Sequence, residues 1–326
     1  MTSVMLGVDV GGTTTAAGLV TDGGEVLIEA QAPTHDAGAG RALDTIVGLV
    51  ESIRKEAGAR GISVDGIGVG LPGIVDAERG RVGEEIPHVP ELAGQPVAAM
   101  LADRFGMPVF VDNDVNALAL AEWTFGRWRG VSSLVVLAPG TGFGSGIVLD
   151  GRLVRGASGF GGEFGHTPVK FDGPPCWCGG RGCLALYASG RGIAEAARRQ
   201  AALPPGAGLA AAVGGDLGAI AAPLVFSLAA EGDAAARAIV YEACRALGAM
   251  IGTVVNGLNP EVVLVTGGVA HAYARLKRQI LRAAGEYALE RALAATRVSI
   301  VPGDKRVTMR GAAALVLYEK QRRASA

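Results

Sequence analysis

Four side chains that bind metal ions lie in one short segment of the sequence. His166 is followed by Cys176, Cys178 and Cys183 in the pattern H-x9-C-x-C-x4-C, with glycines between the last two cysteines that let the chain turn tightly. Three thiolates and one imidazole form a tetrahedral set that is complete without water, as in structural zinc sites. The pattern therefore predicts a structural Zn²⁺ site, and the alternative is a group of free buried cysteines. Cys244 is interpreted as a core residue of a helix.

Two glycine-rich turns, each between apolar runs, could bind phosphate groups. Successive glycines let backbone N–H groups point at an anion, and threonine hydroxyls add uncharged donors. Either turn alone could be a hairpin without a ligand, but two such turns predict a polyphosphate held between two lobes. The first turn contains Asp9, Gly11, Gly12, Thr13 and Thr14, and the second contains Gly140, Thr141, Gly142 and Gly144.

Other nucleotide-binding motifs are absent or incomplete. No Gly-Lys-Ser/Thr occurs, so the sequence has no P-loop. Residues 68–73 match G-x-G-x-x-G, but Pro72 and the apolar residues after Gly73 do not open a helix, which a dinucleotide site requires. These residues are interpreted as a turn that lines a pocket.

Two more sets of polar residues could contact a substrate. Asp112, Asn113 and Asp114 follow a predicted buried strand and precede a predicted helix, where carboxylates commonly face the ligand crevice of an α/β sheet. In the alternative interpretation, Asp112 and Asp114 only cap the helix. Glu163 lies three residues before His166, so a metal would anchor it as a substrate contact; otherwise it is a solvated loop carboxylate.

The elements that must position these residues alternate between strands and helices, which predicts an α/β fold. The second glycine turn repeats the strand, turn, strand pattern of the first, which indicates two related lobes. Strands are predicted at 4–10, 14–20, 26–30, 66–69, 108–111, 133–137, 147–149 and 261–266. Helices are predicted at 41–58, 95–105, 117–122, from about 270 and at 309–322, and residues 190–258 are mostly helical, with breaks near 204–205 and 214–215.

Composition excludes several classes of function. The 326 residues carry a net charge of −1, so no basic excess favours nucleic acid as a partner. The longest apolar stretch, around 219–230, contains Pro223 and is shorter than the ~20 residues that span a membrane. The first residues have no basic segment of the kind that opens a signal peptide. We expect a soluble, cytoplasmic protein with no membrane partner.

The ordered motifs together resemble the ROK family of sugar kinases and sugar-responsive repressors over nearly the whole chain. The matching segments are Asp9–Thr13, Gly140–Gly144, Asn113–Asp114, Gly162–His166, Cys176–Cys183 and Thr266–Val269. The resemblance implies a two-lobed, actin-like ATPase (ribonuclease H-like) fold with a small zinc-binding insertion. It also implies a homodimer or homotetramer. We expect residues 1–116 plus a C-terminal helix at about 307–326 to form a small lobe, and 117–306 a larger lobe with the zinc site.

The resemblance also implies roles for individual residues in a reaction of a sugar with Mg-ATP. Asp114 would be the general base that takes the proton of the attacking sugar hydroxyl. Both glycine turns would hold the phosphates, with Asp9 near Mg²⁺ and Gly267 and Gly268 on the adenosine side. The sugar would be held by Gly73, Asn113, Glu163 and His166, of which His166 would also bind zinc.

One position departs from the family pattern. Two residues after the third zinc cysteine, where the family usually has a sugar-binding glutamate, this chain has Ala185. A methyl group accepts no hydrogen bond, and the loss of a charged partner typically costs ~1.5–3 kcal/mol. Three explanations stay open: weaker binding of the usual hexose, a different sugar, or replacement by another residue such as His88.

The resulting prediction is an ATP-dependent hexose kinase, glucokinase-like, that makes glucose 6-phosphate. The absence of a helix-turn-helix segment before Asp9 disfavours the repressor branch. The alternatives are a kinase for another hexose or an N-acetylhexosamine, a polyphosphate donor in place of ATP, and a non-catalytic sugar sensor of the same fold.

Overall fold

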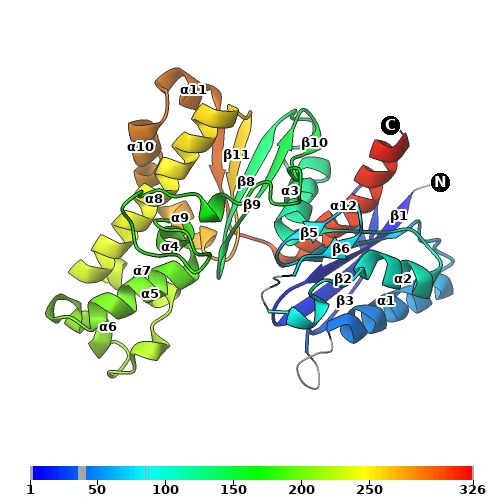
Figure 1. Cartoon of the computed structure of the whole chain (residues 1–326), viewed down its shortest axis with the longest axis horizontal. Coiled ribbons are helices and arrows are strands. Elements are labelled where there is room, and N and C mark those ends of the chain that lie inside the picture. The colour runs from blue at the N-terminus through cyan, green and yellow to red at the C-terminus, as the bar shows by residue number, and fades with distance from the viewer. Residues whose placement is uncertain (1–2, 36–41, 85, 87, 325–326) are drawn as a thin grey trace. The chain divides into compact units, whose positions relative to one another are not determined.

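The computed structural model describes residues 3–35, 42–84, 86 and 88–324, and contains two five-stranded mixed sheets covered by helices (Figure 1). The first sheet has the order β3-β2-β1-β4-β7. Its first three strands are antiparallel, and β4 and β7 continue parallel to β1. The bounds are β1 Val4–Val10, β2 Thr14–Thr21, β3 Val26–Pro33, β4 Ile67–Leu71 and β7 Val109–Asn113.

Helices cover both faces of this sheet. Alternate side chains of β1 and β4 pack with α1 and α2 in one apolar cluster, which includes Leu6, Val8 and Ile67. The opposite face of the same strands, at Gly7 and Gly68, approaches the backbone of α12. The helices of this unit are α1 Ala42–Ala59, α2 Val97–Phe105, α3 Asp114–Thr124 and α12 Lys305–Ala324. A short hairpin, β5 Val75–Asp76 with β6 Arg81–Val82, follows β4.

The second sheet repeats the plan of the first. Its order is β10-β9-β8-β11-β12, with β8, β11 and β12 parallel and β9 joined to β8 across the second glycine turn. In each sheet, the three strands that come first in the chain lie in the order third, second, first. Two later strands follow beside the first strand and run parallel to it. The repeat predicted from the sequence is therefore confirmed. The bounds are β8 Leu134–Pro139, β9 Phe143–Leu149, β10 Arg152–Leu153, β11 Val262–Val265 and β12 Arg297–Ile300.

The longest helix is buried beside the second sheet's other helices. By length and composition α8 could cross a membrane, but 67% of its most apolar window is buried inside the structure, as in a core helix. Cys244 lies on α8 and is fully buried, so its predicted core role is confirmed. The helices here are α4 Ala185–Ala188, α5 Gly190–Ala201, α6 Ala207–Ala211, α7 Ala222–Glu231, α8 Ala234–Leu258, α9 Ala270–Arg275, α10 Lys277–Tyr287 and α11 Glu290–Ala295.

Two compact units divide the chain. The first comprises Met1–Ser132, Gly146–Gly161 and Asp304–Ala326, and the second comprises Ser133–Ser145 and Gly162–Gly303. The lobe boundaries expected from the sequence, after residue 116 and near 307, stay a prediction.

Candidate active site and metal centre

The first glycine turn joins β1 to β2 as a tight hairpin. The Gly11 N–H donates to the Thr14 carbonyl at 3.1 Å, and the buried Thr34 hydroxyl donates to the Gly11 carbonyl at 2.6 Å. These bonds fix the turn, and the side chains of Thr13 and Thr14 remain exposed to solvent. The predicted hairpin is therefore confirmed, with two hydroxyls available to a ligand.

His88 lies against this turn with a left-handed backbone, φ +71°. A Cβ added at Gly12 would lie 2.8 Å from the Cβ of His88, so only glycine fits there without displacing the imidazole. The structure thus places His88 beside the first turn.

Asp9, at the end of β1, has an unusual electrostatic environment. Burial, followed by repulsion from Asp114, raises the pKa of the Asp9 carboxyl to about 7, against a smaller opposing effect of a hydrogen bond with the Thr308 side chain. Two carboxylates from separate elements, β1 and α3, therefore lie close enough to interact. A divalent cation bound between two such half-buried carboxylates would offset their repulsion.

Asn113, and neither of its neighbours, caps α3. Its Oδ1 accepts hydrogen bonds from Val115 N at 2.8 Å and Asn116 N at 3.2 Å, so the interpretation of Asp112 and Asp114 as caps is wrong. Because β7 continues through Asn113, the helix starts at Asp114 and not at 117 as predicted. Asp114 is the first helical residue and half-buried, and its Oδ1 accepts from Val115 N at 2.9 Å.

The Asn113 side chain also fixes the turn after β4. Its Nδ2 donates to the Gly73 carbonyl at 2.9 Å, and Gly73 has φ +81°, a conformation that favours glycine. No helix follows, since Val75 enters the short hairpin. The interpretation of residues 68–73 as a turn is therefore correct only for Pro72 and Gly73, because residues 68–71 belong to β4, and the helix that a dinucleotide site requires does not follow. Two predicted substrate-binding residues are thereby brought together.

Asp112 points into the interior and meets an arginine that sequence reasoning missed. Arg155 Nε donates to Asp112 Oδ2 at 2.7 Å, and its Nη2 reaches Glu319 of α12 at 2.7 Å. Burial raises the pKa of the Asp112 carboxyl, and the Arg155 guanidinium opposes that effect. Asp112 Oδ1 accepts from the backbone N of Asn113 at 2.7 Å, so this buried network holds the chain just before the candidate base. Residues so far apart in sequence leave no local signal of their contact.

The second glycine turn lies beside the turn after β11. The Val269 N–H donates to the Pro139 carbonyl at 2.9 Å, immediately before Gly140. Gly267 has φ +131°, and a Cβ there would lie 2.8 Å from the same carbonyl. The second unit therefore brings together the two segments expected on the phosphate and adenosine sides, with Thr141 and Gly142 exposed.

Glu163 precedes a single helical turn, Phe164–His166. Burial raises the pKa of its carboxyl, and His166 opposes the effect. Among the described residues, its carboxylate has no hydrogen-bonding partner. A half-buried acid without such a partner is better suited to a ligand contact than to a structural role.

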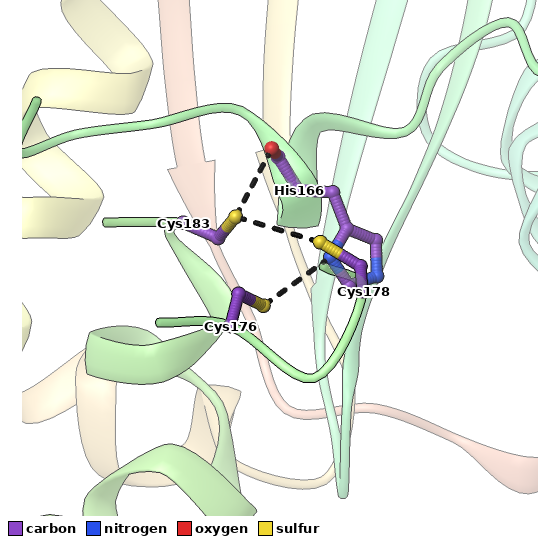
Figure 2. Close-up of side chains that lie close together, drawn as sticks. All are labelled: His166, Cys176, Cys178 and Cys183. Carbon is purple, nitrogen blue, oxygen red and sulfur yellow. Dashed lines mark hydrogen bonds between the residues drawn. The ribbon is translucent and has the colours of Figure 1, made fainter. Parts of the chain in front are cut away.

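The four predicted metal ligands converge (Figure 2). One ligand atom from each of His166, Cys176, Cys178 and Cys183 lies within 4.8 Å of all the others. The Cys178 and Cys183 sulfurs are 3.8 Å apart, which matches the ~3.8 Å between two thiolates bound tetrahedrally at ~2.3 Å. His166 presents Nδ1 to Cys176 Sγ at 3.7 Å. The cluster could hold a metal ion, and the donor set fits Zn²⁺.

Backbone pairing of two segments explains why these residues meet. Val169 N donates to Gly182 O at 2.9 Å and Leu184 N to Thr167 O at 3.0 Å, which sets His166 against Cys183. Ala185 follows, buried, as the first residue of α4. Its methyl group leaves no polar atom in this position.

The doubled sheet plan, with a threonine-bearing glycine hairpin opening each copy, defines the class of proteins with the actin-like ATPase fold. The chain belongs to the ROK family, whose profile matches residues 5–319.

Curated relatives of the chain include both enzymes and a repressor. Glucokinase from Thermotoga maritima is 35% identical over 268 residues, 82% of this chain and 83% of that protein. Xylose repressor from Caldicellulosiruptor bescii is 34% identical over 236 residues, 72% of this chain and 57% of that protein. N-acetyl-D-glucosamine kinase from Escherichia coli is 30% identical, over 88% of this chain and 93% of that protein.

Solved structures of the family have the same fold. A ROK hexokinase from Thermus thermophilus superposes with a TM-score of 0.81 at 31% identity, covering 98% of this chain and 99% of that chain. A ROK glucokinase from Streptomyces griseus, in complex with glucose and AMPPNP, has a TM-score of 0.76 at 29% identity, with 96% and 99% coverage.

Proposed function

We propose that the protein is an ATP-dependent sugar kinase that converts glucose to glucose 6-phosphate in the cytoplasm. The observation that carries the proposal is the interaction of Asp9 with Asp114 beside a threonine-bearing glycine turn. One acid can hold a cation while the other accepts a proton, which is the pair of roles that phosphoryl transfer to a hydroxyl needs. The family's glucokinases and hexokinase support this choice of reaction.

In this proposal Asp114 is the general base. Its carboxylate accepts the proton as the sugar oxygen forms a bond to the γ-phosphorus and the bond from that phosphorus to the ADP oxygen breaks. The Asn113 cap holds the start of α3 in place, so the carboxylate position does not depend on a flexible loop. A fixed base and a fixed hydroxyl reduce the entropy lost in reaching the transition state.

The chain's own donors bind the nucleotide. Backbone N–H groups of both glycine turns and the exposed hydroxyls of Thr13, Thr14 and Thr141 hold phosphate oxygens, and Gly267 and Gly268 border the adenosine. Asp9 would hold Mg²⁺. When bound, Mg²⁺ neutralises charge on the phosphate oxygens.

The sugar is held by Gly73, Asn113, Glu163 and His166. Because His166 turns Nδ1 toward Cys176, Nδ1 would bind the metal and Nε2 would be left to bond a sugar hydroxyl. Zn²⁺ would be held by His166 and the three cysteines, where it fixes the local chain. By resemblance to the family, we also propose a homodimer or homotetramer.

Ala185 favours a second candidate substrate class. The site lacks one acidic contact, and the E. coli relative acts on an N-acetylhexosamine according to its name. A kinase for such a sugar, or for another hexose, is the alternative within enzymes. A sugar-sensing protein is the alternative outside them, in view of the repressor relative.

A panel assay tests the proposal. Purified protein with Mg-ATP, or with polyphosphate as donor, is incubated with hexoses and N-acetylhexosamines, and ADP release and sugar phosphate are measured. Turnover should be highest with glucose, and Asp114→Asn should lower kcat by at least ~100-fold while sugar affinity changes by less than about tenfold. Highest turnover on an N-acetylhexosamine would establish the alternative substrate. Binding of a sugar without any turnover would identify a sensor.

A further inference from the structure

The residue between two of the metal ligands contacts the helix that supports the second glycine turn. The Arg191 guanidinium lies over the Trp177 indole, 4.4 Å from the ring centroid. Trp177 stands between Cys176 and Cys178, and Arg191 is in the first turn of α5. A metal that holds these cysteines therefore also holds the ring against Arg191.

Arg191 and its neighbour bond the glycine turn directly. The Gly190 N–H donates to the Gly140 carbonyl at 2.8 Å, and the Arg191 N–H donates to the Thr141 carbonyl at 3.0 Å. These two carbonyls belong to the turn whose N–H groups are proposed to bind phosphate. Displacing the start of α5 would therefore change the shape of the turn.

The chain from Cys183 to α5 is short and well fixed. Ser189 caps α5, accepting from Gly192 N at 3.0 Å and donating to the Ala185 carbonyl at 2.6 Å. Ala185 begins α4, two residues after Cys183. Cys183 is thus connected to the glycine turn through α4 and the capped N-terminus of α5.

The His166 side of the metal cluster reaches the same turn from its other end. Phe164 N donates to Ser145 Oγ at 3.1 Å, and Ser145 Oγ donates to the Gly162 carbonyl. Gly165 packs so closely on the Phe143 carbonyl that no side chain fits. The metal-binding segments therefore contact both ends of the second glycine turn.

We infer that the metal centre shapes the second phosphate-binding turn, with the Trp177–Arg191 contact as the link, so that metal occupancy sets the affinity for the nucleotide. This inference rests on the proposed function. Trp177 and Arg191 are positioning residues, because they act through the backbone of Gly140 and Thr141. By linkage the effect is reciprocal: nucleotide must tighten metal binding by the same factor.

Binding measurements test the inference without any turnover. The affinity for Mg–AMPPNP is measured by calorimetry on zinc-loaded protein, on protein stripped with a chelator and checked for native circular dichroism, and on Trp177→Ala. Stripping should weaken binding by about fivefold or more, and loaded Trp177→Ala should lose a similar part. In stripped protein, Trp177→Ala should cause no further loss. Trp177→Phe, which keeps an aromatic ring, should retain most of the affinity.

Arg191→Gln and Arg199→Gln form a matched pair, since each removes one positive charge from α5 and Arg199 is exposed. Only Arg191→Gln should weaken Mg–AMPPNP binding. Metal retention against a competing chelator gives an independent readout: Mg–AMPPNP should slow zinc loss from wild type but not from Trp177→Ala.

The outcomes separate the inference from the proposed function. If wild type binds Mg–AMPPNP equally well with and without metal, the inference is wrong and the kinase proposal stands. If stripping unfolds the protein, the test is Trp177→Ala loaded with one zinc per chain. If this variant binds Mg–AMPPNP as tightly as wild type does, the inference is wrong. If loaded wild type binds no Mg–AMPPNP, both are overturned.

Discussion

The carboxyl of Asp9 makes the stability of the folded protein depend on pH. Its pKa is raised to about 7 by burial and by Asp114, whereas an unfolded aspartate titrates near 3.8. Between these values the folded protein holds a proton that the unfolded chain has lost. Stability therefore falls as pH rises through this window and stays low above it, because the folded state must then bury the charge.

We expect Asp9→Asn to remove this decline. Compared with wild type, the variant should gain Tm between pH 5 and pH 8, by roughly 2 to 8 °C in the absence of metal ions. The measurement is thermal unfolding of both proteins across this range. Asp103→Asn, which removes the same charge from an exposed position of α2, is the control. Parallel pH profiles for wild type and Asp9→Asn would contradict the assignment.

The position of the Asp112–Asp114 segment between a strand and a helix could be predicted from the sequence. Which of its three residues caps the helix could not. Asn and Asp cap helices about equally well, so composition could not select Asn113. The position of the end of β7 determines which residue caps the helix. Asp112, still within the strand, points inward to Arg155, and Asn113, the last residue of the strand, is left at the cap. Such a buried ion pair depends on tertiary contacts, which no local pattern encodes. The metal ligands were predictable because they lie close together in the sequence, at a spacing typical of zinc sites.

Among the elements, α12 shows how glycines bring the backbone of a helix close to its neighbours. Gly7 of β1 and Gly68 of β4 meet the carbonyls of Met309 and Ala312, and Gly311 meets the carbonyl of Ala117 in α3. A side chain at any of these positions would overlap the opposing backbone. This close packing also presents Thr308 to Asp9.

Gly311→Ala should therefore destabilise the protein although alanine favours helices. We expect a loss of about 1–3 kcal/mol in the free energy of unfolding, from forcing α12 away from α3. Gly48→Ala is the matched control, because Gly48 is exposed in α1 with open space around it. That change should add about 0.5–1 kcal/mol. Urea unfolding measures both, and equal stabilisation by the two substitutions would refute the close contact.

Most elements follow from periodicity, and the exceptions have local causes. Strand β12, with the sequence RVSI, is absent from the prediction because four residues at a sheet edge carry little apolar signal. Residues 95 and 96 were assigned to α2, but the helix begins at Val97 after Pro96. The alanine-rich region was correctly predicted as helices, with breaks at its prolines and glycines.

At the scale of the whole molecule, the two units carry different parts of the chemistry. The first carries Asp9, Asn113 and Asp114, and the second carries the metal ligands and Glu163. The repeat was visible in the sequence through its two glycine turns. The order of the outer strands was not, because it depends on pairing between distant segments.

Metal removal should act on one unit only. All four ligands belong to the second unit, so chelation should increase amide hydrogen exchange across residues 162–191. Protection in β1, β4 and α12 should be unchanged. Exchange measured by mass spectrometry on loaded and stripped protein checks this. Equal loss of protection in both units would show that the metal stabilises the fold globally.

The place of α12 in the sequence constrains how the protein is made. A ribosome releases the whole second unit before residues 305–324 emerge, yet β1 and β4 need α12 to cover the face marked by Gly7 and Gly68. The part synthesised first is therefore completed last. Until then the nascent chain exposes an uncovered sheet, a surface that chaperones bind. A product terminated before Lys305 lacks the whole of α12, and with it Thr308, whose side chain bonds the Asp9 carboxyl.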